Sequence, residues 1–152
     1  MNKNPSAVLF SCTWNAVRSP MAEGLLKKVL GHKVYVDSVG AKTMDVDGFA
    51  IAVMKEVNVD IKNHQPKSFD DLHDTSYDLI ITLSPEAQHK AMELTRTMHC
   101  DVEFWHTFDP SIVEGSRENR LSAYRRIRNQ LMQQIINRFP TNAASVKAQD
   151  DQ

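Results

Sequence analysis

Residues 7–20 have the sequence AVLFSCTWNAVRSP, and this stretch decides how the chain begins to fold. Its first four residues, Ala7 to Phe10, form a short apolar run that is typical of a buried strand. Ser19 and Pro20 then favour a helix start, because serine often precedes a helix and proline suits its first position. We therefore predict a strand, a polar loop and a helix that runs to about Leu30.

The alternation of strand and helix patterns continues along the rest of the chain. Strands are expected at residues 33–39, 79–83 and 102–105, helices at 48–57, 85–97 and 118–139, and an irregular loop at 58–75. Such alternation is typical of an α/β fold in which helices cover both faces of a parallel sheet. We therefore predict one domain, residues 1–140, with a four-stranded parallel sheet and a polar, flexible tail at residues 141–152.

The composition is that of an ordinary globular protein and excludes several classes of function. The 152 residues carry a formal net charge of −1, which gives no long-range field for nucleic acids or anionic membranes. No apolar run approaches the roughly 20 residues that cross a bilayer, and the first residues lack a signal-peptide pattern. Two cysteines are too few for a disulfide framework. We expect a cytoplasmic protein, monomeric or weakly dimeric, without nucleic-acid or membrane partners.

Cys12 and Arg18 lie at opposite ends of the loop between the first strand and the first helix. A loop at a helix N-terminus presents backbone N–H groups and the positive end of the helix dipole, so it favours an anion. Cysteine thiols in such positions ionise readily, and the planar guanidinium of arginine matches two oxygens of a phosphate. The segment between Cys12 and Arg18 is long enough for the loop to curl into a cup around an anion. The pattern therefore indicates a phosphate-binding loop with a nucleophilic cysteine.

The spacing Cys-x5-Arg-Ser near the N-terminus resembles the low-molecular-weight protein tyrosine phosphatases. The resemblance covers residues 7 to about 139 and includes the helix start at 19–23, the strand end at 37–40 and the dipeptide Asp109-Pro110. It implies a hydrolase that cleaves phosphotyrosine or another aryl phosphate monoester through a phosphocysteine intermediate. The implied substrate is a phosphorylated protein or a small aryl phosphate, and neither a cofactor nor a metal is implied.

The resemblance also implies a role for each residue of the loop. Cys12 attacks phosphorus, Arg18 binds the equatorial oxygens, and Asp109 protonates the leaving oxygen and then activates water. Asn15 shapes the loop, and Ser19 donates a hydrogen bond to the thiolate. The loop residues whose backbone amides would contact the phosphate, together with that of Arg18, are Thr13, Trp14, Asn15, Ala16 and Val17.

Three positions differ from the usual pattern of the family. Trp14 stands where glycine is usual, so it either strains the loop or forms a wall at the mouth of the pocket. Val17 replaces a second loop cysteine that some members carry. Ser111 follows Asp109-Pro110 where phosphotyrosine-specific members usually carry an aromatic residue. These differences leave the substrate open, and a catalytically weak phosphate-binding module remains an alternative.

Arsenate reduction is the main rival activity, since close relatives of this family perform it. Reductases coupled to thioredoxin pass a disulfide to further cysteines, one of which follows the third strand, where this chain has Ser84. Cys100 precedes the predicted fourth strand and is therefore expected near the opposite edge of the sheet from Cys12. A reductase coupled to a small thiol stays open as an alternative. His99, Cys100 and His106 are too few and too loosely spaced for a structural zinc site.

Overall fold

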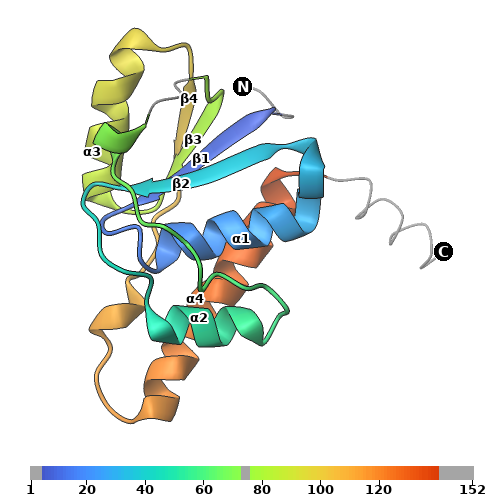
Figure 1. Cartoon of the computed structure of the whole chain (residues 1–152), viewed down its shortest axis with the longest axis vertical. Helices are drawn as coiled ribbons and strands as arrows, with labels where there is room; N and C mark the ends of the chain where they lie inside the picture. Colours follow the sequence, from blue (N-terminus) through green and yellow to red (C-terminus); the bar gives the residue numbers. More distant parts are fainter. Residues whose placement is uncertain (1–4, 73–75, 141–152) are drawn as a thin grey trace, which may run out of the picture.

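Four parallel strands form the centre of the computed structural model, which describes residues 5–72 and 76–140 (Figure 1). The strands are β1 (Ala7–Cys12), β2 (Tyr35–Gly40), β3 (Leu79–Thr82) and β4 (Asp101–Phe104). They lie in the order β2-β1-β3-β4, so β1 is in the interior of the sheet. The predicted parallel sheet is confirmed, and each strand lies within two residues of its expected bounds. The expected tail, residues 141–152, lies outside the described residues.

The helices that accompany the sheet also follow the predicted order. They are α1 (Arg18–Leu30), α2 (Gly48–Lys55), α3 (Pro85–Leu94) and α4 (Arg117–Arg138). Short 3-10 turns are η1 (Gly31–Lys33), η2 (Phe69–Asp71), η3 (Thr95–Thr97) and η4 (Pro110–Ile112). The irregular segment expected at residues 58–75 contains η2, and α3 with η3 covers the helix expected at 85–97. Within the described ranges, no helix is both long and apolar enough to cross a bilayer.

The start of α3 follows the sequence signal. Ser84 is the cap of this helix, and its Oγ accepts a hydrogen bond from the backbone N of Ala87 at 3.3 Å. Pro85 is the first helical residue, a position at which the missing N–H of proline costs nothing.

The start of α1 departs from the same signal. The helix begins at Arg18, and Val17 occupies the cap position without a side-chain cap bond. The expectation that Ser19 precedes the helix is therefore wrong, because its hydroxyl lies 2.9 Å from Cys12 Sγ instead of capping the first turn. Pro20 is tolerated as the third helical residue, because backbone N–H groups in the first turn have no carbonyl partner within the helix, so a missing one removes no helical hydrogen bond.

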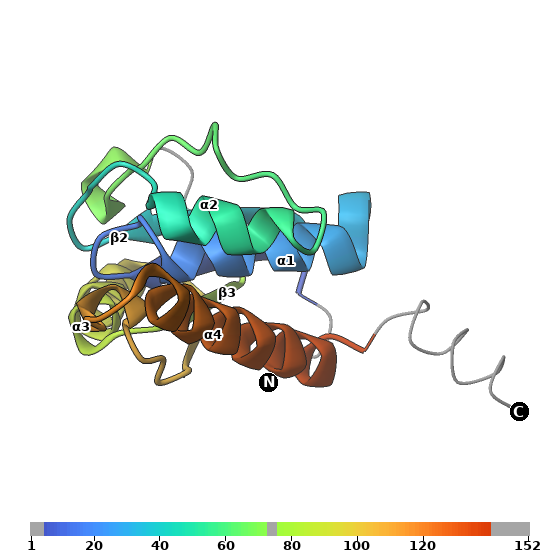
Figure 2. The same ribbon diagram turned by 90° about the horizontal axis from the view of Figure 1, so that it is seen from below.

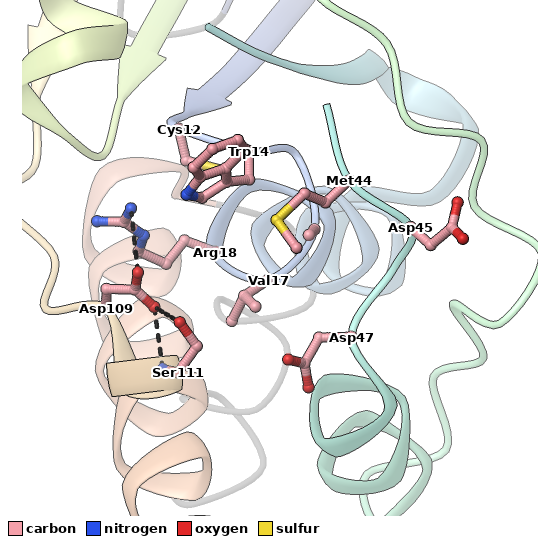
Figure 3. Close-up of a pocket in the computed structure, with 10 residues that line it drawn as sticks. Cys12, Trp14, Val17, Arg18, Met44, Asp45, Asp47, Asp109 and Ser111 are labelled. Atoms are coloured by element: carbon pink, nitrogen blue, oxygen red, sulfur yellow. Dashed lines mark hydrogen bonds and ion pairs between the residues drawn. The ribbon is translucent and has the colours of Figure 1, made fainter. Parts of the chain in front are cut away.

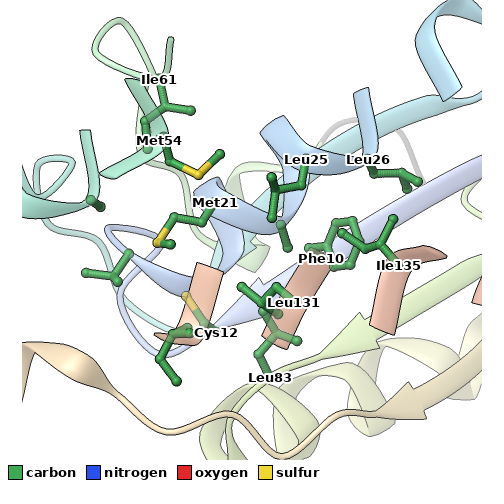
Figure 4. Packing of buried hydrophobic residues seen from close by; sticks show 14 of the residues in the cluster. Phe10, Cys12, Met21, Leu25, Leu26, Met54, Ile61, Leu83, Leu131 and Ile135 are labelled. Atoms are coloured by element: carbon green, nitrogen blue, oxygen red, sulfur yellow. The ribbon is translucent and has the colours of Figure 1, made fainter. Parts of the chain in front are cut away.

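Apolar side chains fill both sides of the sheet. Successive residues of β1 point to opposite faces, so Phe10 joins the larger cluster with α1 and α4, and Leu9 joins a smaller cluster with α3. Burial of each such large side chain contributes about 1.5–3 kcal/mol to the free energy of folding. The buried residues of α4 are Leu121, Ala123, Tyr124, Ile127, Leu131 and Ile135. Figure 4 shows part of the larger cluster around Phe10.

The helices form two layers around the sheet, as predicted. Figure 2 shows α2, α1 and α4 lying together, and Figure 1 shows α3 on the other side of the sheet. The carboxyl ends of the parallel strands meet at one edge of the sheet, where β1 leads into α1 and β3 leads into α3. Ligands of open parallel sheets bind beyond this edge. The carboxyl edge of the sheet is therefore the place where a ligand site is expected.

Candidate active site

The loop between β1 and α1 is held from outside by residues 41–47, which follow β2. Four backbone N–H groups of this segment donate to loop carbonyl oxygens at 2.8–3.1 Å. The pairs are Ala41 to Cys12, Lys42 to Thr13, Met44 to Trp14 and Asp47 to Ala16. No peptide bond in the described residues is cis, and a trans peptide directs its N–H away from its C=O. The loop amides that follow these carbonyls therefore point away from residues 41–47.

Gly40, the last residue of β2, permits this close approach. A Cβ atom at this position would lie 2.3 Å from the Lys42 oxygen, 2.7 Å from the Asn15 nitrogen and 2.8 Å from the carbonyl carbon of Trp14. All three atoms belong to the backbone, so none of them can move aside as a side chain could. A larger residue at position 40 would therefore displace the loop.

Asn15 has a left-handed backbone, with φ of 55°, and its side chain is fully buried. Its Nδ2 donates hydrogen bonds to Ser19 Oγ at 2.9 Å and to Ser38 Oγ at 3.0 Å. Its Oδ1 accepts from the backbone N of Lys67 at 3.0 Å and lies 2.9 Å from His64 Nε2. Both ends of the amide are used. The bend of the loop is therefore tied to α1, to β2 and to the segment that carries His64.

Cys12 ends β1, and only 2% of the residue is exposed. Its Sγ accepts a hydrogen bond from the backbone N of Ser19 at 3.4 Å and lies 2.9 Å from Ser19 Oγ. The Ser19 hydroxyl can also donate to the Val39 carbonyl, at 3.3 Å. The first turn of α1 thus brings two hydrogen-bond donors within reach of the sulfur.

Arg18 is the first residue of α1 and is buried. Its Nη1 donates to the Thr107 carbonyl at 2.9 Å, and its Nη2 donates to Thr13 Oγ1 at 3.3 Å. The same Nη2 lies 4.0 Å from Asp109 Oδ2. Thr107 and Asp109 belong to the connection between β4 and α4. The guanidinium therefore joins the loop to that connection, and its five N–H donors exceed the bonds it makes here.

The Thr13 hydroxyl links Arg18 to the start of α3. Its Oγ1 lies 3.0 Å from Ser84 Oγ and 3.0 Å from Glu86 Oε2. A hydroxyl has one proton and two lone pairs, so all partners are satisfied if Glu86 receives the proton and the lone pairs accept from Arg18 and Ser84. The backbone N–H of Glu86 and the Thr13 hydroxyl lower the pKa of the Glu86 carboxyl. Glu86 is therefore a charged acceptor at neutral pH.

Asp109 is the cap of η4. Its Oδ1 accepts hydrogen bonds from the backbone N of Ser111 at 2.9 Å and from Ser111 Oγ at 2.7 Å. Its Oδ2 is the oxygen that faces Arg18, and a quarter of the side chain, 25%, is exposed. One carboxylate oxygen is thus fixed by the turn, and the other faces the interior of the site.

These residues surround a pocket of about 110 Å³ at Cys12 (Figure 3). Its lining residues are Cys12, Trp14, Ala16, Val17, Arg18, Met44, Asp45, Asp47, Asp109 and Ser111. Pockets for drug-sized ligands measure roughly 300–1,000 Å³, so this one suits a small anion that carries one substituent. Sequence reasoning missed Met44, Asp45 and Asp47. Only the position of their segment, directly after the second predicted strand, could have indicated that they reach the site.

The structure brings the predicted Cys12, Arg18 and Asp109 to one pocket, but the other loop residues divide into two groups. The side chains that line the pocket are those of Trp14, Ala16 and Val17, whereas those of Thr13, Asn15 and Ser19 bond to their neighbours. The left-handed residue of the loop is Asn15, so Trp14 has no positive φ. Its ring forms part of the pocket wall, and Lys42 Nζ lies 5.3 Å from the ring centroid.

Cys100 lies far from Cys12. It precedes Asp101, which is in register with Leu79 of β3 and through it with Val8 of β1, whereas Cys12 lies four residues beyond Val8. At roughly 3.3 Å per residue, the two cysteines are separated by more than about 15 Å along the strands. Burial raises the pKa of the Cys100 thiol to about 11. Within residues 5–72 and 76–140, no three His, Cys, Asp or Glu side chains gather in positions that could hold a metal ion.

Comparison with known proteins identifies the family. Residues 7–149 match the family described as low molecular weight phosphotyrosine protein phosphatase. The chain belongs to this family. The resemblance drawn from Cys12, Arg18 and Ser19 is therefore confirmed, and the matched region contains the whole of the sheet and its helices.

Relatives within this family include both reductases and phosphatases. The chain is 32% identical over 124 residues to an arsenate reductase from Bacillus subtilis, across 82% of this chain and 88% of that protein. A solved arsenate reductase in its oxidized state superposes with a TM-score of 0.72 at 27% identity, across 88% of this chain and 95% of that one. A solved low molecular weight tyrosine phosphatase from T. tengcongensis gives 0.70 at 25% identity, across 85% and 94%. The family is one of enzymes, and these likenesses do not separate a phosphatase from an arsenate reductase.

Proposed function

We propose that the protein is a cysteine-dependent phosphatase that hydrolyses phosphotyrosine or another aryl phosphate monoester. One observation carries the proposal: the thiol of Cys12, the guanidinium of Arg18 and the carboxylate of Asp109 line a single small pocket, while the second thiol of the chain lies far away. Hydrolysis of a phosphate ester needs a nucleophile, a group that binds the phosphate oxygens and a general acid, and Cys12, Arg18 and Asp109 can supply them in that order. Relay of a disulfide within the chain needs a second thiol close by.

In the first step, Cys12 Sγ attacks phosphorus in line and forms an S–P bond while the P–O bond to the leaving group breaks. The electron pair of the broken bond stays on the leaving oxygen, which takes a proton from Asp109. Arg18 and the loop amides of residues 13–18 stabilise the charge on the equatorial oxygens, and the Ser19 donors stabilise the thiolate.

In the second step, water attacks the phosphocysteine. Asp109, now ionised, removes a proton from this water, because the residue that gave a proton in the forward step must accept one in the next. The S–P bond breaks, its electron pair returns to Cys12, and inorganic phosphate leaves. Asn15 keeps the loop in the same bend throughout, since its four hydrogen bonds do not involve the substrate.

The test is the variant Cys12→Ser, with Cys100→Ser as the matched control. We expect Cys12→Ser to lose turnover of an aryl phosphate while it still binds orthophosphate, because the cup is made of backbone amides. Cys100→Ser should keep full activity. Substantial turnover by Cys12→Ser would contradict the assignment of the nucleophile. Phosphate binding without turnover by the wild-type protein would instead favour a phosphate-binding module.

Reduction of arsenate with a small thiol is the second candidate, and the identity to curated arsenate reductases favours it. In that reaction Cys12 Sγ would attack arsenic and form an S–As bond while one As–O bond breaks and its oxygen leaves as water. A small thiol would then attack Cys12 Sγ, which breaks the S–As bond, releases arsenite and leaves a mixed disulfide. A second thiol molecule would then reduce this disulfide, so that two thiols supply the two electrons that take As(V) to As(III). Arsenate-dependent oxidation of glutathione or a similar thiol, measured beside aryl phosphate hydrolysis, separates the two candidates.

A further inference from the structure

The arginines of α4 differ in their partners. Three of them, farther along the helix, form ion pairs with glutamates at 2.7–2.9 Å. Arg117 and Arg120, in the first turn, instead lie over the ring of Phe49, with their guanidinium carbons 5.5 and 4.4 Å from the ring centroid. Among the residues that the structure describes, neither of these two guanidiniums has a hydrogen bond or an ion pair. Arg117 and Arg120 thus form an arginine pair whose N–H donors are available to a ligand.

Phe49 places the arginine pair beside the mouth of the pocket. Its backbone N donates to Asp47 Oδ1 at 2.7 Å, and Asp47 lines the pocket. The Phe49 ring packs against Tyr124, with the ring centroids 5.4 Å apart, and the Tyr124 hydroxyl donates to Asp47 Oδ2 at 2.9 Å. Figure 2 shows the first turns of α2 and α4 at the same end of the molecule. The arginine pair flanks the pocket without lining it, so it would contact a part of the ligand that extends beyond the pocket.

The Phe49 ring also prepares the arginine pair for an anion. A guanidinium that stacks on an aromatic face keeps the N–H groups of its edge directed outward. Because the side chains are already restricted, less conformational entropy is lost when a ligand binds them. A carboxylate can accept two parallel hydrogen bonds from such a planar group. The arginine pair therefore suits a carboxylate that lies just outside the pocket.

The carboxylates of residues 41–47 favour the same direction. Asp45 is exposed, and Figure 3 shows its side chain pointing away from the pocket. Asp47 already accepts hydrogen bonds from two backbone N–H groups and from the Tyr124 hydroxyl. Both carboxylates repel an acidic chain that leaves the pocket over residues 41–47, whereas the arginine pair attracts one that leaves over α4.

We propose, on the basis of the function proposed above, that the arginine pair binds an acidic side chain close to the phosphotyrosine of a peptide or protein substrate. With the phosphoryl group at Cys12 and the phenol oxygen facing Asp109, the substrate backbone lies at the mouth of the pocket. An extended chain spans about 3.3–3.6 Å per residue, so an acidic residue within about three positions of the phosphotyrosine can reach the flank of the pocket. The arginine pair thus selects acidic phosphopeptides.

The test uses two peptides that carry a phosphotyrosine analogue resistant to hydrolysis, difluorophosphonomethyl phenylalanine. One peptide has glutamate at the three positions on each side of the analogue, and the other has glutamine there. Titration calorimetry should show that the wild-type protein binds the glutamate peptide roughly three- to tenfold more tightly, as exposed ion pairs allow. High salt should remove most of this preference, because it screens exposed charges.

The variants are compared by the ratio of the two affinities, because damage to the phosphate site weakens both peptides alike. Arg117→Gln should lower the ratio, and Arg117→Gln combined with Arg120→Gln should bring it close to one. The matched control is Arg126→Gln, which removes the same charge from the same helix about half a turn around the axis from Arg117. This control should keep the ratio of the wild-type protein, and the unfolding midpoint reports any damage to the fold.

Two results would overturn the role of the arginine pair: a ratio near one in the wild-type protein, or an unchanged ratio in the double variant. The variant Lys42→Gln tests another cation near the mouth, whose Nζ lies 5.3 Å from the centroid of the Trp14 ring. A preference that is lost in Lys42→Gln and kept in the double variant belongs to Lys42 and also overturns the proposal.

Failure of the arginine pair and failure of the proposed phosphatase give different results. A preference for the glutamate peptide that depends on the arginine pair, in a protein that hydrolyses no phosphotyrosine peptide, would support the pair and refute the phosphatase. Hydrolysis of the matching phosphotyrosine peptides with equal kcat/KM would support the phosphatase and refute the pair.

Discussion

The two halves of the candidate active site are built differently. On one side, the loop after β1 is buried, and Cys12, Asn15 and Ser19 are almost inaccessible. Residues 41–47 hold its backbone through hydrogen bonds, and the Asn15 side chain bonds to hydroxyls of β2 and α1. On the other side, the connection between β4 and α4 is open. It exposes Phe108 by 49% and Ile112 by 65%, and Asp109 is held mainly by the turn that it caps.

This difference separates two tasks. The buried half presents amides, a guanidinium and a thiol in a geometry that is fixed before an anion binds, as electrostatic stabilisation requires. The open half carries the carboxylate that would handle the leaving group, and its exposure leaves room for different leaving groups. Apart from the nucleophile Cys12 itself, we therefore expect changes in the buried half to alter stability and anion affinity, and changes in the open half to alter chemistry with little effect on the fold.

After loss of the nucleophile itself, the largest expected effect belongs to the open half, in the variant Asp109→Asn. Asparagine keeps the Oδ1 acceptor that caps η4, so the turn should persist while the proton is lost. Turnover of aryl phosphates with poor leaving groups should fall by about 10²–10⁴-fold, and much less with good leaving groups. Steady-state kinetics over a series of phenols measures this. Equal slowing across the series, or weaker orthophosphate binding, would break the division between the two halves.

A change in the buried half, Asn15→Ala, should act mainly on stability. It removes four hydrogen bonds, two buried and two partly buried, and leaves alanine with a positive φ, so the free energy of unfolding should fall by about 2–4 kcal/mol. The matched control is Asn58→Ala. Asn58 also has a positive φ, 63°, but is exposed, so this control should lose only about 1 kcal/mol. Denaturant unfolding measures both, and equal losses would mean that the buried network contributes nothing.

A smaller effect is expected from the link between Thr13 and Glu86. Thr13→Val removes the acceptor for Arg18 Nη2 and should weaken orthophosphate binding by roughly three- to tenfold. Thr13→Ser should restore the affinity. Glu86→Ala should act through the same hydroxyl, so the double variant should lose less than the two single losses combined. Strict additivity in inhibition constants would show that Glu86 does not position Arg18 through Thr13.

The smallest effect is expected from Cys100→Ser, which should leave the rate of inactivation by hydrogen peroxide unchanged. Hydrogen peroxide should oxidise Cys12 to the sulfenic and then the sulfinic acid, and a small thiol can trap the sulfenic acid as a mixed disulfide. The distance along the sheet prevents Cys100 from trapping it within the chain. Bound phosphate should slow the inactivation. A dominant Cys12–Cys100 disulfide in a non-reducing peptide map would overturn this expectation and favour the reductase.

The sequence predicts much of the fold because the strands and helices have clear periods and boundaries. The apolar residues of β3 and the core side of α4 identify their elements without any knowledge of their neighbours. The wrong expectation concerns Ser19, whose local sequence repeats that of Ser84. Local pattern could not separate them, because the Ser19 hydroxyl is engaged by Cys12, seven residues earlier, and the Ser84 hydroxyl accepts from its own helix.

The loop of the candidate site is also visible in the sequence, but its supports are not. Cys12 and Arg18 have a characteristic spacing, whereas His64 and Lys67 come from an irregular segment without periodicity. Met44 reaches the pocket because residues 41–47 bond to the loop carbonyls. Backbone bonds of this kind depend on how the chain returns in space, and side-chain identity carries little information about them.

The glycine at position 40 has a consequence for transplanting this loop into another protein. The residues from Cys12 to Ser19 are contiguous in sequence, yet four of their carbonyl oxygens accept hydrogen bonds from amides about thirty residues later in the chain. If only these residues were transferred to a host protein, the four carbonyls would lose their partners. The transferred loop would also collide with any side chain that the host carries at the end of the neighbouring strand. The smallest transferable unit is therefore the two adjacent strands β1 and β2 together with the segment that follows each of them. The second strand must end in glycine.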